Sequence, residues 1–162
     1  MSTDHRLGPV VTDAARRRIG TVTASYRSDP VSLRQIREYI AGTGGRPQDI
    51  DEARTDEPIC APPLFFHAAC RPVVAEDDLL RDGQYPFLGV PGVSGRTMAG
   101  GHKYEVVAPV RVGDVLTVTE RLTDITEKNG SSGPLVFVTT EAEYHNQARK
   151  LVGRYRQTVI FL

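Results

Sequence analysis

The segment Pro109-Val110-Arg111-Val112-Gly113-Asp114 marks the turn after which the chain becomes a series of long strands. Its last two residues favour a tight turn, because glycine has extra backbone freedom and an aspartate side chain can bond local amides. Stretches typical of antiparallel strands follow it, at 115–122, 135–144 and 151–161. Long strands after a helical first half are typical of an α+β fold in which a curved antiparallel sheet wraps around a central helix.

The first half of the chain predicts one strand and two helices. Residues 19–26 alternate in polarity, as expected of a half-buried strand. The pair Asp29-Pro30 predicts the start of a helix over 31–41, with the aspartate as N-cap. Residues 58–72 are apolar almost all round, which predicts the central helix of the fold. Residues 76–101 are expected to form a long connection.

Length and charge narrow the class of protein. The 162 residues suit one domain, which we place at 19–162 behind an N-terminal arm at 1–18. Twenty basic residues balance twenty acidic ones, so we expect neither nucleic acid nor an anionic membrane as partner. The first 20 residues lack a long apolar run, so we expect a cytoplasmic protein. Cys60 and Cys70 are interpreted as reduced, buried side chains, and no metal or cofactor site is predicted.

Five groups of residues, in this order, together resemble the MaoC-like dehydratase family, in its N-terminal-type (FAS1-like dehydratase) domain. They are Tyr39-Ile40-Ala41-Gly42-Thr43-Gly44, Ala61-Pro62-Pro63-Leu64-Phe65, Met98-Ala99-Gly100-Gly101-His102-Lys103-Tyr104-Glu105, Ala108-Pro109-Val110-Arg111-Val112-Gly113-Asp114, and Glu127-Lys128-Asn129-Gly130 with Gly133-Pro134-Leu135-Val136-Phe137-Val138. The resemblance implies a single hot-dog fold. It also implies hydratase or dehydratase activity on acyl-CoA or acyl-carrier-protein thioesters.

The resemblance also implies where catalytic members carry their acid and base. An Asp and a His lie in a Gly-Asp-x-Asn-Pro-x-His loop after the first helix, where they handle the water and a proton of the acyl chain. In this sequence the Asp position falls on Gly45 or Arg46, and the His position on Gln48 or Asp49. We therefore expect the non-catalytic, substrate-accommodating subunit of an (R)-specific enoyl-thioester hydratase or 3-hydroxyacyl-thioester dehydratase. Its catalytic hot-dog partner would be another protein.

Two alternatives stay open at this point. The chain is a free-standing homodimeric hydratase or thioesterase with relocated acidic or histidine residues, or it is a module that binds an acyl thioester without turnover. Asp49 and His67 are the candidates for relocated catalytic groups. Against this, Asp49 lies in an acidic run typical of a solvated loop, and a lone histidine on an apolar helix is commonly a hydrogen-bonded core residue.

Four residues are candidates for binding the substrate. Arg96 offers a guanidinium that can fork onto a phosphate of CoA or phosphopantetheine. Pro62, Phe65 and Phe66 lie at the start of the expected central helix, where aromatic rings can bound an acyl pocket. His102 is expected to have a structural or rim role. The acyl-chain length, the choice between CoA and a carrier protein, and the reaction direction are not determined by these residues.

Overall fold

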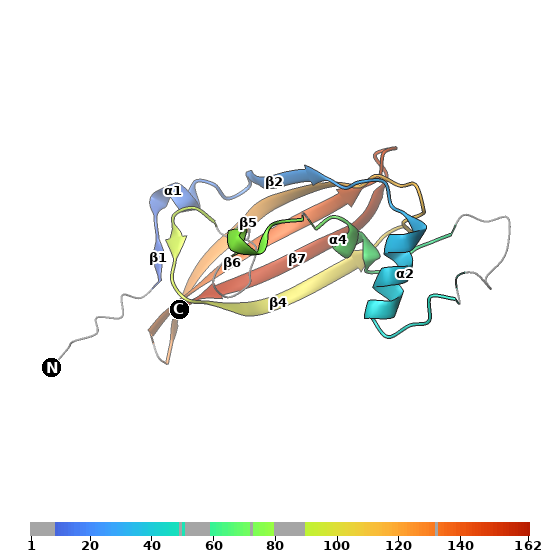
Figure 1. The fold of residues 1–162 in the computed structure, drawn as a ribbon. Helices are drawn as coiled ribbons and strands as arrows, with labels where there is room; N and C mark the ends of the chain where they lie inside the picture. Colours follow the sequence, from blue (N-terminus) through green and yellow to red (C-terminus); the bar gives the residue numbers. More distant parts are fainter. Residues whose placement is uncertain (1–8, 49, 51–58, 72, 80–89, 132) are drawn as a thin grey trace.

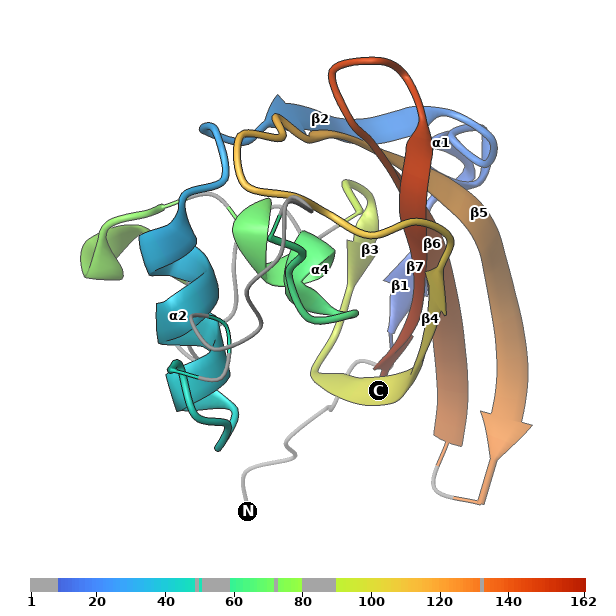
Figure 2. The same ribbon diagram turned by 90° about the vertical axis from the view of Figure 1, so that its right-hand side faces the viewer.

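A five-stranded antiparallel sheet with the strand order β2-β5-β6-β7-β4 forms the body of the protein (Figure 1). The computed structural model describes residues 9–48, 50, 59–71, 73–79, 90–131 and 133–162. The strands are β2 (Val22–Arg27), β4 (Thr97–Val106), β5 (Thr117–Gly130), β6 (Gly133–His145) and β7 (Leu151–Phe161). The sheet curves around the side on which the helices α2 and α4 lie (Figure 2). The expected α+β fold with a curved antiparallel sheet is confirmed.

The strand predictions hold for β6 and β7, whereas β5 begins two residues later than the predicted 115–122 and extends eight residues beyond it. The start of β4 was not predicted. Residues 97–101 were expected to belong to a long connection, but β4 already begins at Thr97. The register of β4 against β7 shifts between Ala99 and Gly101, so Gly100 lies at a bulge. Glycines at a bulge look like a loop in the sequence, because the same backbone freedom serves both structures.

The helix α2 (Leu33–Gly42) begins two residues later than expected. The N-cap is Ser32 rather than Asp29, and Ser32 forms a capping box with Gln35. The reason is tertiary, since Val31 is hydrogen-bonded to the Gly113-Asp114 turn before β5. Its N–H donates to the Asp114 carbonyl at 2.8 Å and its own carbonyl accepts from the Gly113 N–H at 2.8 Å. Val31 is therefore fixed before the helix can start.

The expected central helix over 58–72 is much shorter in the structure. Only α4 (Phe65–Ala69) is helical, while Cys60 forms an antiparallel bridge with Arg111. Two consecutive prolines, Pro62 and Pro63, explain the difference, because proline lacks the N–H that a helix interior requires. Cys60 is exposed, which corrects the expectation that both cysteines are buried; Cys70 is buried, and neither forms a disulfide.

Residues 10–16, part of the expected arm, form β1 (Val10–Val11) and α1 (Asp13–Arg16). β1 pairs with β3 (Val93–Ser94) in a separate two-stranded sheet. Ala15 of α1 is fully buried against the sheet residues near the far ends of β5, β6 and β7. This small layer therefore covers the end of the sheet opposite to α2 and α4 (Figure 1).

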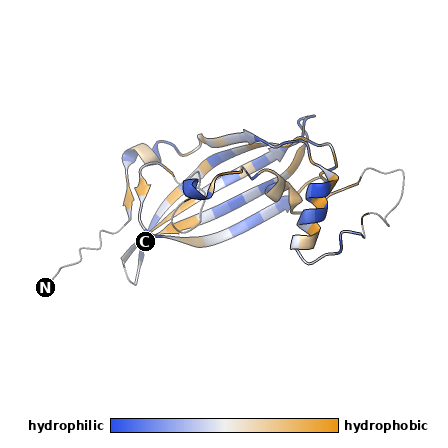
Figure 3. Cartoon of the chain, in the orientation of Figure 1, coloured by the Kyte–Doolittle hydropathy of each residue, from blue (hydrophilic) through white to orange (hydrophobic). Residues whose placement is uncertain are grey.

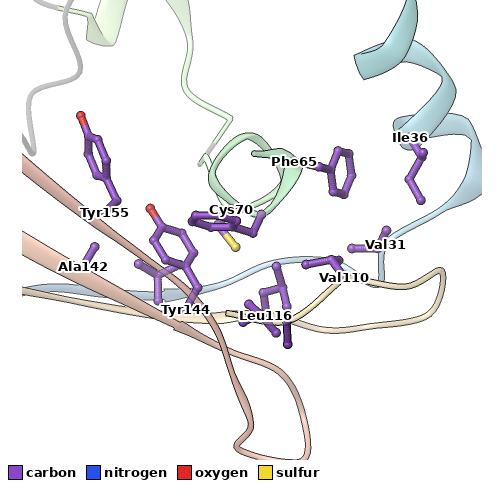
Figure 4. Close-up of a cluster of buried hydrophobic side chains, with 13 residues drawn as sticks. Val31, Ile36, Phe65, Cys70, Val110, Leu116, Ala142, Tyr144 and Tyr155 are labelled. Carbon is purple, nitrogen blue, oxygen red and sulfur yellow. The ribbon is translucent and has the colours of Figure 1, made fainter. Parts of the chain in front are cut away.

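The sheet has two apolar cores on its concave side. The first lies under α2 and α4 and contains Phe65, Phe66, Leu116 and Tyr144 among its buried members (Figure 4). The second lies under α1 and β1 and includes Leu122, Ile125, Val136, Val138 and Phe161. The turn after Pro109 has the glycine conformation and the aspartate hydrogen bond that were expected. Gly113 has a φ of 89°, and the Asp114 carboxylate accepts from the Arg111 N–H at 2.8 Å.

Gly153 on β7 offers a direct test of how α4 is seated. A Cβ added there would lie 2.7 Å from two atoms of the Phe66 ring. We expect Gly153→Ala to lower the free energy of unfolding by about 1–3 kcal/mol, the usual cost of overpacking. Urea unfolding followed by circular dichroism measures it. Gly42→Ala is the matched control, because a Cβ at Gly42 meets nothing within 4 Å. Equal stability of the two variants would contradict this packing.

Candidate functional site

Polar residues cross the concave face between the two apolar cores. In the strand register, Tyr104 lies beside Tyr155, and Ala142 connects Tyr155 to Glu120. The next row brings together His102, Gln157, Thr140 and Leu122. We call the six polar members of these rows the polar belt: Tyr104, Tyr155, Glu120, His102, Gln157 and Thr140. Hydrophilic colour crosses the middle of the strands in Figure 3.

The polar belt follows from strand alternation, because every second residue of a strand points to the same face. Glu120 lies between Val118 and Leu122 in that alternation, and both neighbours are fully buried. A charged residue in the buried phase of a strand is the signal in the sequence that could have revealed this site. Apart from His102, no residue of the polar belt is among the candidates predicted from the sequence, which come from the loops and the expected central helix.

Glu120 is the buried carboxyl group of the polar belt, with 8% of its surface exposed. The Thr23 hydroxyl, at a bulge of β2, donates to Glu120 Oε1 at 2.9 Å. Burial raises the pKa of Glu120, and the hydrogen bond from Thr23 partly opposes that rise. A carboxyl group held in this environment keeps its proton to higher pH than a solvated one, so it is suited to hydrogen-bond donation or proton transfer.

Three tyrosines extend the polar groups around Glu120. Burial, together with the smaller effect of the Glu120 charge, raises the pKa of Tyr26 to about 12. The pKa values of Tyr144 and Tyr155 are also raised, again first by burial and then in part by Glu120. Figure 4 shows the side chains of Tyr144 and Tyr155 on the same side of the sheet. These phenols stay protonated at physiological pH and act as neutral hydrogen-bonding groups.

His67, a candidate catalytic residue, lies on α4 and faces the tyrosines. Its Nδ1 is 2.8 Å from the Tyr144 hydroxyl, and its Nε2 accepts from the Arg71 guanidinium at 3.2 Å. Burial lowers the pKa of His67 to about 4, with the charges of Arg71 and His102 contributing in the same direction. Both ring nitrogens are thus engaged within the chain. This geometry suits a neutral histidine that fixes α4 to the sheet.

The four substrate-binding candidates do not come together in the structure. Phe65 packs edge-on against Tyr39 of α2 with ring centroids 5.5 Å apart, and Phe66 packs on Tyr144 at 4.8 Å. Pro62 precedes α4, where its carbonyl accepts from the Phe65 N–H at 3.0 Å. Arg96 is exposed just before β4, whose ten residues span roughly 30 Å. Phe66 meets β7 at Gly153, opposite the far end of β4.

The loop after α2 has little room for a side chain at position 45. Gly44 has a φ of 85°, and a Cβ on Gly45 would lie 2.7 Å from Cγ2 of Ile40. An aspartate at position 45 would therefore require the Ile40 side chain to move. Asp49, the other candidate catalytic residue, lies outside the described residues.

Two general properties bear on the chemistry of the site. Among the described residues, no three His, Cys, Asp or Glu side chains gather closely enough to hold a metal ion. Over the same residues, no helix is both long and apolar enough to span a bilayer.

A strongly curved antiparallel sheet with short helices on its concave side defines a protein of the hot-dog class. Residues 17–154 match the family model described as "FAS1-like, dehydratase domain region". The chain belongs to this MaoC-like, FAS1-like family of hot-dog hydratases and dehydratases, as its sequence motifs indicate. No curated protein matches the chain by sequence.

Solved structures share the fold at low sequence identity. The ChsH1-ChsH2 complex from Mycobacterium tuberculosis contains a chain with 13% identity and a TM-score of 0.66, over 93% of this chain and 89% of that one. R-hydratase PhaJ1 from Pseudomonas aeruginosa has 17% identity and a TM-score of 0.55, over 85% and 78%. The HadBC complex from Mycobacterium tuberculosis, a 3R-hydroxyacyl-ACP dehydratase, has 16% identity and a TM-score of 0.56, over 85% and 94%.

His67 leads to a prediction about pH. Its pKa is lower in the folded chain than the ordinary 6.5, so the unfolded chain binds more protons between about 4 and 6.5. The contribution of neutral His67 to stability is complete above pH 6.5 and is lost progressively down to pH 4. We expect His67→Gln to flatten the fall in melting temperature over this range. His145→Gln is the matched control, and an unchanged slope in His67→Gln would contradict the prediction.

Glu120 is expected to make the fold less stable as the pH rises, which is the opposite of the effect of His67, because the pKa of Glu120 is raised on folding. The stabilisation that its bound proton gives is present below the ordinary pKa of 4.5 and is lost as the pH rises through the folded value. Glu120→Gln keeps the shape and stays neutral, so we expect a higher melting temperature than wild type at pH 8 and equal values at pH 4. A lower melting temperature at pH 8 would show that the ionised carboxylate stabilises the fold. Glu141→Gln, on the same sheet but only half-buried, is the control.

Proposed function

We propose that this chain is the substrate-accommodating half of an (R)-specific enoyl-thioester hydratase or 3-hydroxyacyl-thioester dehydratase, paired with a catalytic hot-dog subunit. The loop after α2 carries the proposal. Gly45 or Arg46 occupies the position of the acid, and Ile40 lies where a side chain on residue 45 would begin. An acid and a base facing one acyl carbon are needed for hydration, so a partner that supplies them completes the reaction.

The edge of the sheet supports the pairing. β4 is the last strand in the sheet order and is ten residues long. Large apolar side chains on or beside it are exposed: Met98, Tyr104, Val106 and Val107. An exposed, apolar edge strand invites pairing with another strand unless it is covered. A second hot-dog sheet continuing from β4 would cover both the backbone and these side chains. The ChsH1-ChsH2 and HadBC structures are complexes by their names.

The concave face supports an acyl thioester as the ligand. The polar belt lies between the two apolar cores and is exposed at its β4 end, at His102 and Tyr104, so a thioester bound there would meet groups that can bond its oxygen atoms. Phe65, Phe66 and Pro62 would bound the acyl pocket from α4, and Arg96 would contact a phosphate of the carrier. Asp49 is a candidate only in the alternative in which the chain is a free-standing hydratase or thioesterase with relocated catalytic residues.

The experiment is co-expression of the full chain with each hot-dog protein of the same organism that carries an intact Gly-Asp-x-Asn-Pro-x-His loop. Crotonyl-CoA hydration is then measured on the chain, the partner and the complex. We expect a stable complex whose activity greatly exceeds that of either part. Enzyme-like hydration by the chain alone would overturn the proposal and assign the chemistry to its own residues. Thioester binding without turnover in any combination would leave a binding module.

The exposed edge at β4 leads to a prediction about the affinity for the partner subunit. We expect Val107→Lys to weaken the complex about tenfold or more, because a lysine buried in an apolar interface loses its hydration. Val73→Lys is the matched control, since Val73 is fully exposed and lies outside the strands. Analytical ultracentrifugation of each variant with the partner measures the affinity of the complex. Equal affinities would place the interface elsewhere on the chain.

A further inference from the structure

Two histidines flank Tyr155 on the concave face. His67 of α4 approaches the Tyr155 ring with centroids 4.3 Å apart, and His102 of β4 stacks on it at 5.6 Å with an interplanar angle of 11°. Tyr104 stacks on the same ring at 4.8 Å. Tyr155 is buried, whereas His102 and Tyr104 are exposed. The four rings therefore run from the interior to the β4 edge of the sheet.

The hydrogen bonds around Tyr155 fix the tautomer of His102. The Tyr155 hydroxyl donates its single proton to Gln157 Oε1 at 2.7 Å. His102 Nδ1 lies 2.5 Å from the same hydroxyl oxygen, so Nδ1 must carry a proton and donate it. Nε2 of neutral His102 is then unprotonated and has a lone pair to offer. The buried end of this chain, Gln157, is 6% exposed and belongs to the sheet itself.

The comparison with His67 shows which histidine can receive a ligand. A guanidinium only donates, so Arg71 takes the lone pair of His67 Nε2, and His67 Nδ1 donates to Tyr144. Both histidines thus have the Nδ1–H tautomer. Within the described part of the chain, however, nothing donates to His102 Nε2, and the residue is exposed. The Nε2 lone pair of His67 accepts a hydrogen bond from the protein, whereas that of His102 is available to a ligand.

We propose that His102 Nε2 accepts a hydrogen bond from the hydroxyl group of a 3-hydroxyacyl thioester, or from the water that adds to the enoyl form. The assignment rests on the proposed function for the thioester and adds the residue that recognises its hydroxyl. An acceptor nitrogen selects a donor, so it favours a hydroxyl or water over a phosphate or carboxylate, which offer only lone pairs. The Tyr155–Gln157 pair orients the ring, which makes both of them positioning residues.

The location fits this role. His102 belongs to the strand at which the proposed partner would dock, and its register neighbour Gln157 continues into the polar belt. Titratable and charged groups near the ring are Tyr155, Tyr104, His67 and, beyond them, Arg71 and Glu120. The substrate hydroxyl would meet His102 at the open side of this group. The catalytic acid and base would act on the same acyl carbons from the partner.

The tautomer is tested first, in the full chain. Long-range proton–nitrogen NMR correlation distinguishes Nδ1–H from Nε2–H in a neutral imidazole. We expect Nδ1–H at His102 in the wild type and Nε2–H, the form favoured in water, in Tyr155→Phe, which cannot hold the Nδ1 proton. Nε2–H at His102 in the wild type would overturn the proposal. Melting temperatures of both proteins establish that Tyr155→Phe is folded.

Ligand recognition is tested with two probes that differ in one hydroxyl, (R)-3-hydroxybutyryl-CoA and butyryl-CoA. Calorimetry on the chain and on its complex should show a preference of about threefold to tenfold for the hydroxylated probe, as expected for one added hydrogen bond. His102→Phe keeps a ring without an acceptor and should abolish the preference. Lys103→Gln, the next residue along β4 and on the opposite face, should keep it.

The outcomes separate the two proposals. Equal binding of both probes to the wild type, or an unchanged preference in His102→Phe, overturns the role of His102 and leaves the proposed function intact. Failure of both thioesters to bind the chain and the complex overturns the proposed function and this inference together. A preference that is lost in His102→Phe and kept in Lys103→Gln supports both.

Discussion

The contact between Phe66 and the bare backbone of Gly153 sets the distance between α4 and the sheet. A Cβ at this point of β7 would lie 2.7 Å from the Phe66 ring, so only glycine lets the helix come this close. Gly153 lies opposite Tyr144 in the register, and the Phe66 ring packs against Tyr144 as well. A helix of five residues has little stability of its own, and this packing holds it in place. His67, the next residue, is thereby brought to the tyrosines.

The concave face combines apolar packing with polar groups whose desolvation disfavours folding. Burial of Glu120 disfavours its charged form, and the three tyrosines around it are likewise desolvated. Over the described residues, no buried side-chain nitrogen or oxygen lacks a hydrogen-bond partner. The hydrogen bonds therefore offset part of the desolvation, yet apolar residues at these positions would give a more stable core. A polar row kept between two apolar cores is what a binding surface for a partly polar ligand requires.

The edge strand connects this surface with assembly. β4 carries His102 and Tyr104 on the concave side, and Met98 and Val107 add exposed apolar surface at or beside the same edge. Pairing a second sheet against β4 would bring the partner's groups next to the open end of the polar belt. In such an arrangement neither subunit needs the whole catalytic set. One side can supply proton transfer, while the other supplies the apolar floor and the group that recognises the hydroxyl.

Local patterns determined much of the fold. Alternation predicted β5, β6 and β7, and the Gly113-Asp114 turn has the predicted glycine conformation and aspartate hydrogen bond. The errors arose where distant contacts prevail over local preference. The hydrogen bonds of Val31 with Asp114 and Gly113 delay α2 until Ser32, and pairing of the Cys60 region with Arg111 replaces the first half of the expected central helix. No local pattern encodes such pairings.

The same division applies to the site. The sequence by itself determined the family and the strand series, because each of these is written in consecutive residues. The expectation that the loop after α2 lacks the catalytic acid comes from consecutive residues too. The sequence also contains an indication of the polar belt that the predictions did not use: the charged residue Glu120 stands at a strand position that alternation predicts to be buried. Only the tertiary structure decided that Tyr155 contacts both His67 and His102. It also decided that Arg71 donates to Nε2 of His67 and not to Nε2 of His102. Hydrogen-bond donors from α4, β4 and β7 meet at these atoms, and their meeting depends on strand register and helix seating rather than on sequence distance.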